Sequence, residues 1–262
     1  LWADPRPLAL TMNGRTIATL LMLACLAPAK TFAASNSLGL IGTHFNVLML
    51  SFMAPVAAVG HYGAGYRLTE SLTLATVLFG QFYMPRIAHS LATHHGLAPF
   101  RTSFGLLFAV TMPIGVGLAL FPEFIVKLVF GQDFLQTITV LRIMGVFYIV
   151  CCFDALLSMV LKAASLQRLD FFILLSNPLV NGLVNLALIP QHGAVGAAIG
   201  LLSGGLCSAT LRYLFTTRRI GTLGWLRLAA PWAAMSLALG GALVLAAARL
   251  SPWSQILLYG LF

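Results

Sequence analysis

The chain has 262 residues, of which 60% are hydrophobic and only 8% are charged, and its mean hydropathy is +0.95. Soluble globular domains carry about 25% charged residues, so this composition excludes a water-soluble protein and indicates a protein embedded in a membrane. The net charge of +9 comes from cations that lie singly or in pairs between apolar runs, a distribution typical of membrane topology and not of nucleic-acid binding.

Apolar segments long enough to cross a bilayer recur along the sequence. A transmembrane helix needs about 20 predominantly apolar residues. Segments that meet this requirement lie near 20–52, 57–84, 99–121, 136–161, 171–190, 193–216 and 227–249, and a further one begins at 253. We therefore predict an all-α integral membrane protein with about seven complete transmembrane helices and a truncated eighth. The initial Leu1 and the short final run both suggest cuts through a longer protein.

Positive charge alternates between the two sides of these predicted spans. Ten of the fifteen Lys and Arg residues lie before the first span or around every second connection: Arg6, Arg15, Arg86, Arg101, Lys162, Arg168, Arg212, Arg218, Arg219 and Arg227. The opposite side carries only Lys127 and Arg249. By the positive-inside rule, the chain begins in the cytoplasm and the short loops at 53–57 and 190–193 face outward.

The first predicted span carries polar residues at a regular spacing. Lys30, Ser37, His44 and Ser51 are seven residues apart, so they stay near one helix face. Lys30 and His44 are candidates to line a substrate cavity. In the alternative interpretation, Lys30 extends to the membrane surface and His44 is a packing residue.

The second predicted span is the richest in polar side chains. Gly63, Arg67, Glu70 and Gln81 share one stripe, and Arg67 and Glu70 are three residues apart, close enough to pair. In one interpretation, they form a self-neutralised pair near the outer interface. In the other, Arg67 is a cationic group in a substrate cavity, and Glu70 holds it in place or exchanges a proton.

The segment that follows the third span differs from the other connections. Residues 121–134 are mostly apolar, with two acids and one cation, a composition that suits a short helix lying in the membrane interface. No connection is long enough to hold an inserted soluble domain.

The fourth predicted span places Asp154, Ser158 and Lys162 on one face. Asp154 lies about two turns from the cytoplasmic end of that span. A buried acid at that depth is a candidate proton carrier, and with Glu70 it is our candidate for ion coupling. Pairing of Asp154 with another helix is the structural alternative.

The fifth predicted span contains three asparagines, Asn177, Asn181 and Asn185, at four-residue intervals, with Pro178 beside the first. This ridge either joins helices by hydrogen bonds or contributes to a substrate cavity. In the sixth span, Gly196, Gly200 and Gly204 form a seam for close helix packing.

The sequence lacks the motifs of soluble catalytic centres. It contains no P-loop, no dinucleotide-binding glycine pattern, no HExxH and no GxSxG. The four cysteines lie inside apolar segments and form no CxxC or metal-ligand spacing. We therefore expect no enzymatic activity, no cofactor and no metal site.

Several short motifs occur in an informative order. They are VGHYGAGYRL (59–68), MPRIA (84–88), MPIG (112–115), IVKLVFGQDF (125–134) and LIPQHGAVGAAIG (188–200). Together they resemble the C-terminal half of polysaccharide-biosynthesis flippases of the O-antigen transporter type, within the multidrug/oligosaccharidyl-lipid/polysaccharide exporter superfamily.

This resemblance implies one lobe of a two-lobe alternating-access transporter in the bacterial inner membrane. Residues 20–220 would form the C-terminal lobe, after a cytoplasmic segment at 1–19 and before additional transmembrane helices at 221–262. The implied substrate is an undecaprenyl-diphosphate-linked oligosaccharide, and the implied partner is the missing N-terminal lobe. The first two spans would line the cavity, with Arg67 meeting the diphosphate. Asn46 stands where many relatives carry an acid, which puts a coupling role at that position in doubt.

Two other functions remain open. A multidrug or organic-cation exporter of the same superfamily is the nearest alternative, but such cavities tend to be acidic. A membrane glycan polymerase or ligase is the second, although such enzymes typically need a larger outer loop than the segment at 121–135.

Overall fold

The structure, a computed structural model, describes residues 44–92, 98–219, 230–231, 233–238 and 240–241. The described part is all-α, as predicted, and contains no strand. Its helices are His44–Met53, α2 (Val56–Ala92), α3 (Ala98–Leu120), α4 (Pro122–Phe130), the 3-10 helix η2 (Gln132–Phe134), α5 (Thr137–Ala163), α6 (Gln167–His192) and α7 (Ala194–Arg219), and the described residues between 230 and 241 are also helical. The predicted segment 1–19, Lys30, most of the span at 227–249 and the truncated eighth span lie outside the described residues.

Three of the described helices, α5, α6 and α7, are long and apolar enough to cross a membrane. The end of α3 and α4 together would make a fourth, with a bend of 85° between them. This supports a membrane-embedded protein, while the count of seven spans stays a prediction. Helix α2 is 37 residues long and does not meet the same test, because polar side chains lower its hydropathy.

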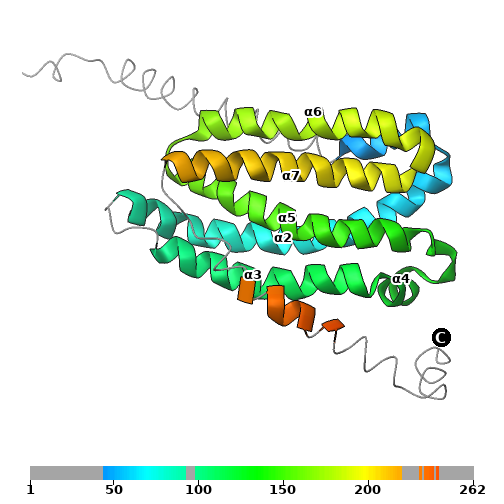
Figure 1. Cartoon of the computed structure of the whole chain (residues 1–262), viewed down its shortest axis with the longest axis horizontal. Coiled ribbons are helices and arrows are strands. Elements are labelled where there is room, and N and C mark those ends of the chain that lie inside the picture. Colours follow the sequence, from blue (N-terminus) through cyan, green and yellow to red (C-terminus); the bar gives the residue numbers. More distant parts are fainter. Residues whose placement is uncertain (1–43, 93–97, 220–229, 232, 239, 242–262) are drawn as a thin grey trace, which may run out of the picture.

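Helix α5 lies at the centre of the bundle and packs against α2, α3 and α7, while α6 packs mainly on α7 (Figure 1). The long helices run along a common direction, so the bundle has two ends. We call them the Gly193 end, where α6 turns into α7, and the Ser165 end, where α5 turns into α6. Helix α4 lies at the Gly193 end and is seen along its axis in Figure 1.

The two tight turns between these helices use left-handed backbone conformations. At the α5–α6 turn, Ser165 has φ 60°, and the Leu166 N–H donates to the Leu161 carbonyl at 2.8 Å. These features form a Schellman-type helix end. At the α6–α7 turn, Gly193 has φ 52°, a conformation that glycine adopts at little steric cost.

Glycines on α7 allow α6 to approach closely, as the glycine seam predicts. A Cβ added at Gly196 would lie 2.5 Å from the Leu188 carbonyl oxygen, and one at Gly200 would lie 2.0 Å from Asn185 Oδ1. The Leu188 carbonyl belongs to the α6 backbone, which cannot move without shifting the helix. Gly196 therefore sets the distance between α6 and α7.

We expect Gly196→Ala to lower the free energy of unfolding by about 1–3 kcal/mol, the usual cost of overpacking. Chemical unfolding of the purified chain in detergent measures this change. Gly105→Ala is the matched control, because it lies within α3 and a Cβ there meets nothing within 4 Å. The control should leave stability unchanged or raise it slightly, since alanine favours helix over glycine. Equal effects of the two substitutions would contradict the close approach.

Candidate functional site

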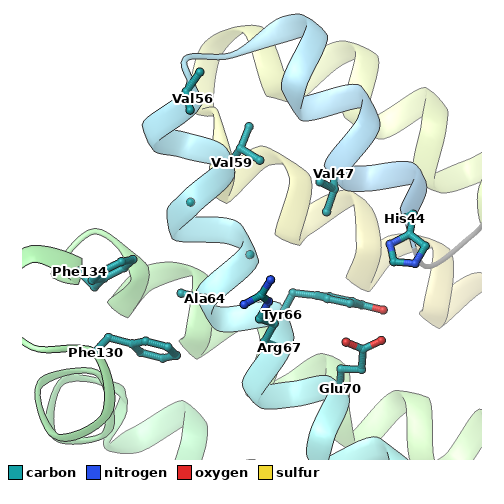
Figure 2. A pocket seen from close by; sticks show the side chains of 12 residues that line it. His44, Val47, Val56, Val59, Ala64, Tyr66, Arg67, Glu70, Phe130 and Phe134 are labelled. Carbon is teal, nitrogen blue, oxygen red and sulfur yellow. The ribbon is translucent and has the colours of Figure 1, made fainter.

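A cavity of about 710 Å³ opens beside α2 towards the Gly193 end of the bundle (Figure 2). Its walls come from the helix His44–Met53, the first half of α2, and the last residues of α4 and η2. Its lining consists of His44, Val47, Val56, Val59, Gly60, Gly63, Ala64, Tyr66, Arg67, Glu70, Phe130 and Phe134. The cavity therefore brings together three of the predicted site residues, His44, Arg67 and Glu70.

Arg67 is the only arginine or lysine in this lining, and its side chain is exposed. Although Glu70 is three residues away, no ion pair between the two occurs among the described residues. Figure 2 shows the guanidinium and the Glu70 carboxylate pointing in different directions. This arrangement disagrees with a self-neutralised pair and leaves the Arg67 charge available to a ligand.

The depth of Arg67 along the bundle bears on whether this residue lies near the outer interface or in a cavity inside the membrane. A Cβ on Gly193 would lie 3.7 Å from Ala58 Cβ, so the α6–α7 turn is level with Ala58. Arg67 follows Ala58 by nine residues, which corresponds to about 13 Å along a helix. If α6 and α7 span a hydrocarbon core about 30 Å thick, Arg67 lies well inside it, not at its surface.

Small residues of α2 form the floor of the cavity. Cβ atoms added at Gly60 and Gly63 would meet nothing within 4 Å, so the space above both residues is open. These two glycines and Arg67 recur at three- and four-residue intervals, which places them on one helix face. A ligand in the cavity can therefore lie close to the α2 backbone and reach Arg67.

One wall of the cavity is aromatic. The rings of Phe130 and Phe134 are 5.6 Å apart, and Phe134 makes an edge contact with His61 at 5.7 Å. The Thr137 hydroxyl donates to the His61 carbonyl oxygen at 3.2 Å and lies 3.3 Å from His61 Nδ1. These contacts fix the wall against α2. Sequence reasoning did not assign the two phenylalanines to a site.

The three asparagines of α6 lie away from this cavity. Asn181 and Asn185 are buried and face the glycine seam of α7. Asn185 Nδ2 donates to Asn46 Oδ1 at 2.5 Å, joining α6 to the helix His44–Met53. Asn177 also lies against this seam, because its side-chain oxygen is 2.9 Å from the position of a Cβ on Gly204. The arrangement favours hydrogen bonding between helices over contact with a ligand in the cavity.

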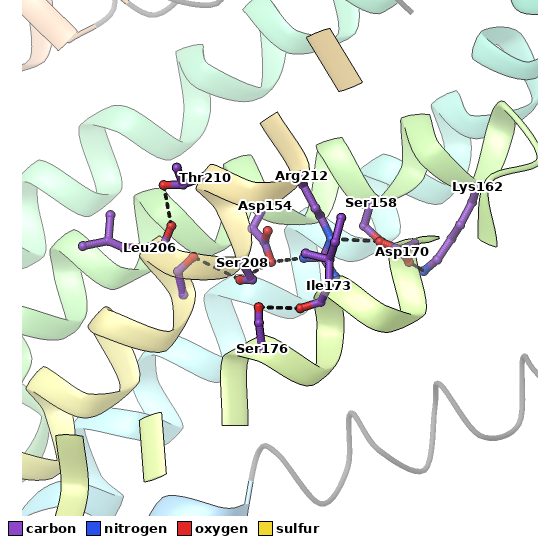
Figure 3. Close-up of polar contacts among 11 residues, drawn as sticks. Asp154, Ser158, Lys162, Asp170, Ile173, Ser176, Leu206, Ser208, Thr210 and Arg212 are labelled. Atoms are coloured by element: carbon purple, nitrogen blue, oxygen red, sulfur yellow. Dashed lines mark hydrogen bonds and ion pairs between the residues drawn. The ribbon is translucent and has the colours of Figure 1, made fainter. Parts of the chain in front are cut away.

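Asp154 belongs to a second polar cluster, near the Ser165 end (Figure 3). Arg212 of α7 pairs through Nη1 with Asp154 Oδ2 of α5 and, at 2.8 Å through Nε, with Asp170 Oδ1 of α6. Ser208 donates to Asp154 at 3.2 Å, and Ser158 donates to Asp170 at 2.9 Å. We call these five residues the ionic cluster. It links three helices, and its arginine is 3% exposed.

Lys162 also contributes to this cluster, because its Nζ lies 3.6 Å from Asp170 Oδ2. The charge pattern of the sequence groups Arg212 with the cations that set topology. One signal could have found the pairing. Asp154 lies nine residues before the end of α5 and Arg212 seven before the end of α7, so opposite charges occur at similar depths within apolar segments.

Within the described part of the chain, no group of three or more His, Cys, Asp or Glu side chains could hold a metal ion. No family model matches the chain, and no curated protein matches it either. The function must therefore be inferred from the geometry of the cavity and from the sequence resemblance.

Proposed function

We propose that this chain is one lobe of a transporter that moves a lipid-linked oligosaccharide across the bacterial inner membrane. The observation that carries the proposal is Arg67, an exposed cation well inside the predicted membrane core that makes no ion pair with Glu70. A charge near the centre of a bilayer costs about 2.5–3.5 kcal/mol on insertion scales. Such a residue persists where it faces a water-filled cavity or an anionic ligand.

The chemistry of the cavity suits a diphosphate next to apolar or sugar groups. A guanidinium is always charged and presents a planar fork of donors that matches phosphate oxygens. Phe130 and Phe134 offer ring surfaces at the Gly193 end of the same cavity. We assign Arg67 to the diphosphate, and Glu70 and His44 to orienting groups around it.

The orientation of the chain in our proposal follows from the charge bias of the sequence. With the chain beginning in the cytoplasm, the Gly193 end faces the periplasm and the cavity lies towards that side. In our proposal, alternating access closes this side while the substrate enters from the cytoplasm, and a second lobe supplies the opposite wall. The chain itself carries out no covalent chemistry.

Deletion of the gene in its own organism tests the proposal. We expect undecaprenyl-linked oligosaccharide to accumulate in the inner membrane, inaccessible to a glycosidase added from the periplasmic side, while surface glycan falls. Restoring the gene should reverse both changes.

Other outcomes identify the alternatives. Unchanged glycan with new sensitivity to cationic drugs would contradict the proposal and favour an exporter. Single repeat units that accumulate in a form accessible from the periplasm would instead favour a polymerase or ligase.

A further inference from the structure

Helix α4 has an orientation unlike that of the other helices. It follows α3 after a bend of 85°, so it lies nearly perpendicular to a helix that runs along the bundle. Because α5, the next long helix, is apolar enough to cross a membrane, a helix perpendicular to this direction lies parallel to the membrane plane. Figure 1 shows α4 at the Gly193 end, where the long helices stop.

The side chains of α4 point in four directions around the helix axis. Val126 is fully buried and packs with Leu118 and Leu141, which fixes the side that faces the bundle. Successive residues of an α-helix are about 100° apart, so Phe124 and Leu128 point away from the bundle. They are 44% and 54% exposed.

The two flanks of α4 differ in polarity. Glu123 and Lys127 lie on one flank, where Lys127 Nζ donates to Glu123 Oε1 at 2.8 Å. Ile125 and Val129 lie on the opposite flank, and Val129 is 52% exposed. A helix in a membrane interface needs this division, with a polar flank towards water and an apolar flank towards the acyl chains.

Exposed apolar side chains also occur on α3, the helix before the bend. Leu106 and Val110 are 46% and 53% exposed, whereas Leu120 lies against the segment at 240–241, because a Cβ on Gly240 would be 2.6 Å from Leu120 Cδ1. Lipid can therefore cover the middle of α3, and the outward face of α4 lies beyond the bend. We propose that α4 binds the lipid surface at the Gly193 end as an amphipathic anchor, with Phe124 and Leu128 among the upper acyl chains and the Glu123–Lys127 pair at the headgroups. This inference does not depend on which substrate the cavity binds.

Photo-crosslinking tests the proposal directly. The photoreactive amino acid p-benzoylphenylalanine is introduced at Phe124, at Leu128 or at Glu123 in separate copies of the full chain. Each variant is reconstituted in vesicles of phosphatidylethanolamine and phosphatidylglycerol and irradiated, and the intact mass of the protein is then measured by mass spectrometry. We expect adducts of one phospholipid at positions 124 and 128, severalfold more abundant than at position 123.

Three results would overturn the proposal: adducts as abundant at position 123 as at 124 and 128, no lipid adduct at 124 and 128, or crosslinks from these positions to a second copy of the chain. The last result would identify a protein interface in place of a lipid one. Positions 124 and 128 are both exposed, so substitution at either disturbs no core packing, and each position tests the proposal alone if the other variant expresses poorly.

Discussion

An Arg67→Ala variant is expected to lose most transport, with surface glycan and export of the lipid-linked intermediate reduced roughly ten- to hundredfold. The size of the effect follows from the loss of hydrogen bonds to a charged group, worth about 1.5–3 kcal/mol. Arg67→Lys should fall between the alanine variant and the wild type, because lysine keeps the charge but loses the fork of donors. Complementation of the deletion strain with each variant, at matched protein levels, measures this order.

Arg142→Ala is the matched control for this series. Arg142 is also an exposed arginine in a predicted span, but it is not part of the cavity lining. The Arg142→Ala variant should therefore restore surface glycan as fully as the wild type. Full transport by Arg67→Ala, or equal losses in the Arg67 and Arg142 variants, would remove the reason for assigning Arg67 to the substrate.

The second large effect is expected from Arg212→Met, which should lower the free energy of unfolding by about 3–5 kcal/mol. Removing the guanidinium leaves the carboxylates of Asp154 and Asp170 buried without their main partner. Replacing all three groups, with Arg212→Met, Asp154→Leu and Asp170→Leu together, should recover most of this loss, because the three buried charges are then removed together and Lys162, which loses Asp170, is 37% exposed. Chemical unfolding in detergent of the purified Arg212→Met and triple variants compares their free energies of unfolding.

Arg218→Met provides the control for the loss of an α7 cation, since Arg218 is exposed and lies outside the ionic cluster. Its stability should match that of the wild type. If the triple variant is no more stable than Arg212→Met, the ionic cluster does not act through charge compensation.

The same cluster bears on the idea that Asp154 carries a coupling proton. In the structure, its carboxylate is held by Arg212 and Ser208 and lies outside the lining of the Arg67 cavity. We therefore expect Asp154→Asn to lower stability but to keep transport per folded molecule. If Asp154→Asn instead loses transport while keeping normal stability, the result would support Asp154 as the carrier of a coupling proton.

The sequence predicts the boundaries of α5, α6 and α7 closely, because apolar composition and the turn at Gly193 both limit the spans. It predicts less well where α2 ends. The expected span stopped at residue 84, whereas α2 continues through Pro85 to Ala92. Hydropathy locates the part of a helix that suits lipid and does not report how far the helix extends beyond it.

Sequence periodicity also placed Arg67 and Glu70 on one stripe of α2, and both line the same cavity. It could not show that their charged groups point apart, because rotamers depend on neighbouring helices. Phe130, Phe134 and the Arg212 pairs were missed for a related reason. Each depends on contacts between helices that are distant along the chain.

The central position of α5 has a consequence for biogenesis. Helices α2 and α3 emerge from the ribosome before α5, and each makes most of its described contacts with α5. We therefore expect α2 and α3 to reach their final packing only after α5 has been inserted. Insertion of α5 then provides the surface on which α2, α3 and later α7 assemble, so the lobe forms around its middle helix and not in simple order from its first.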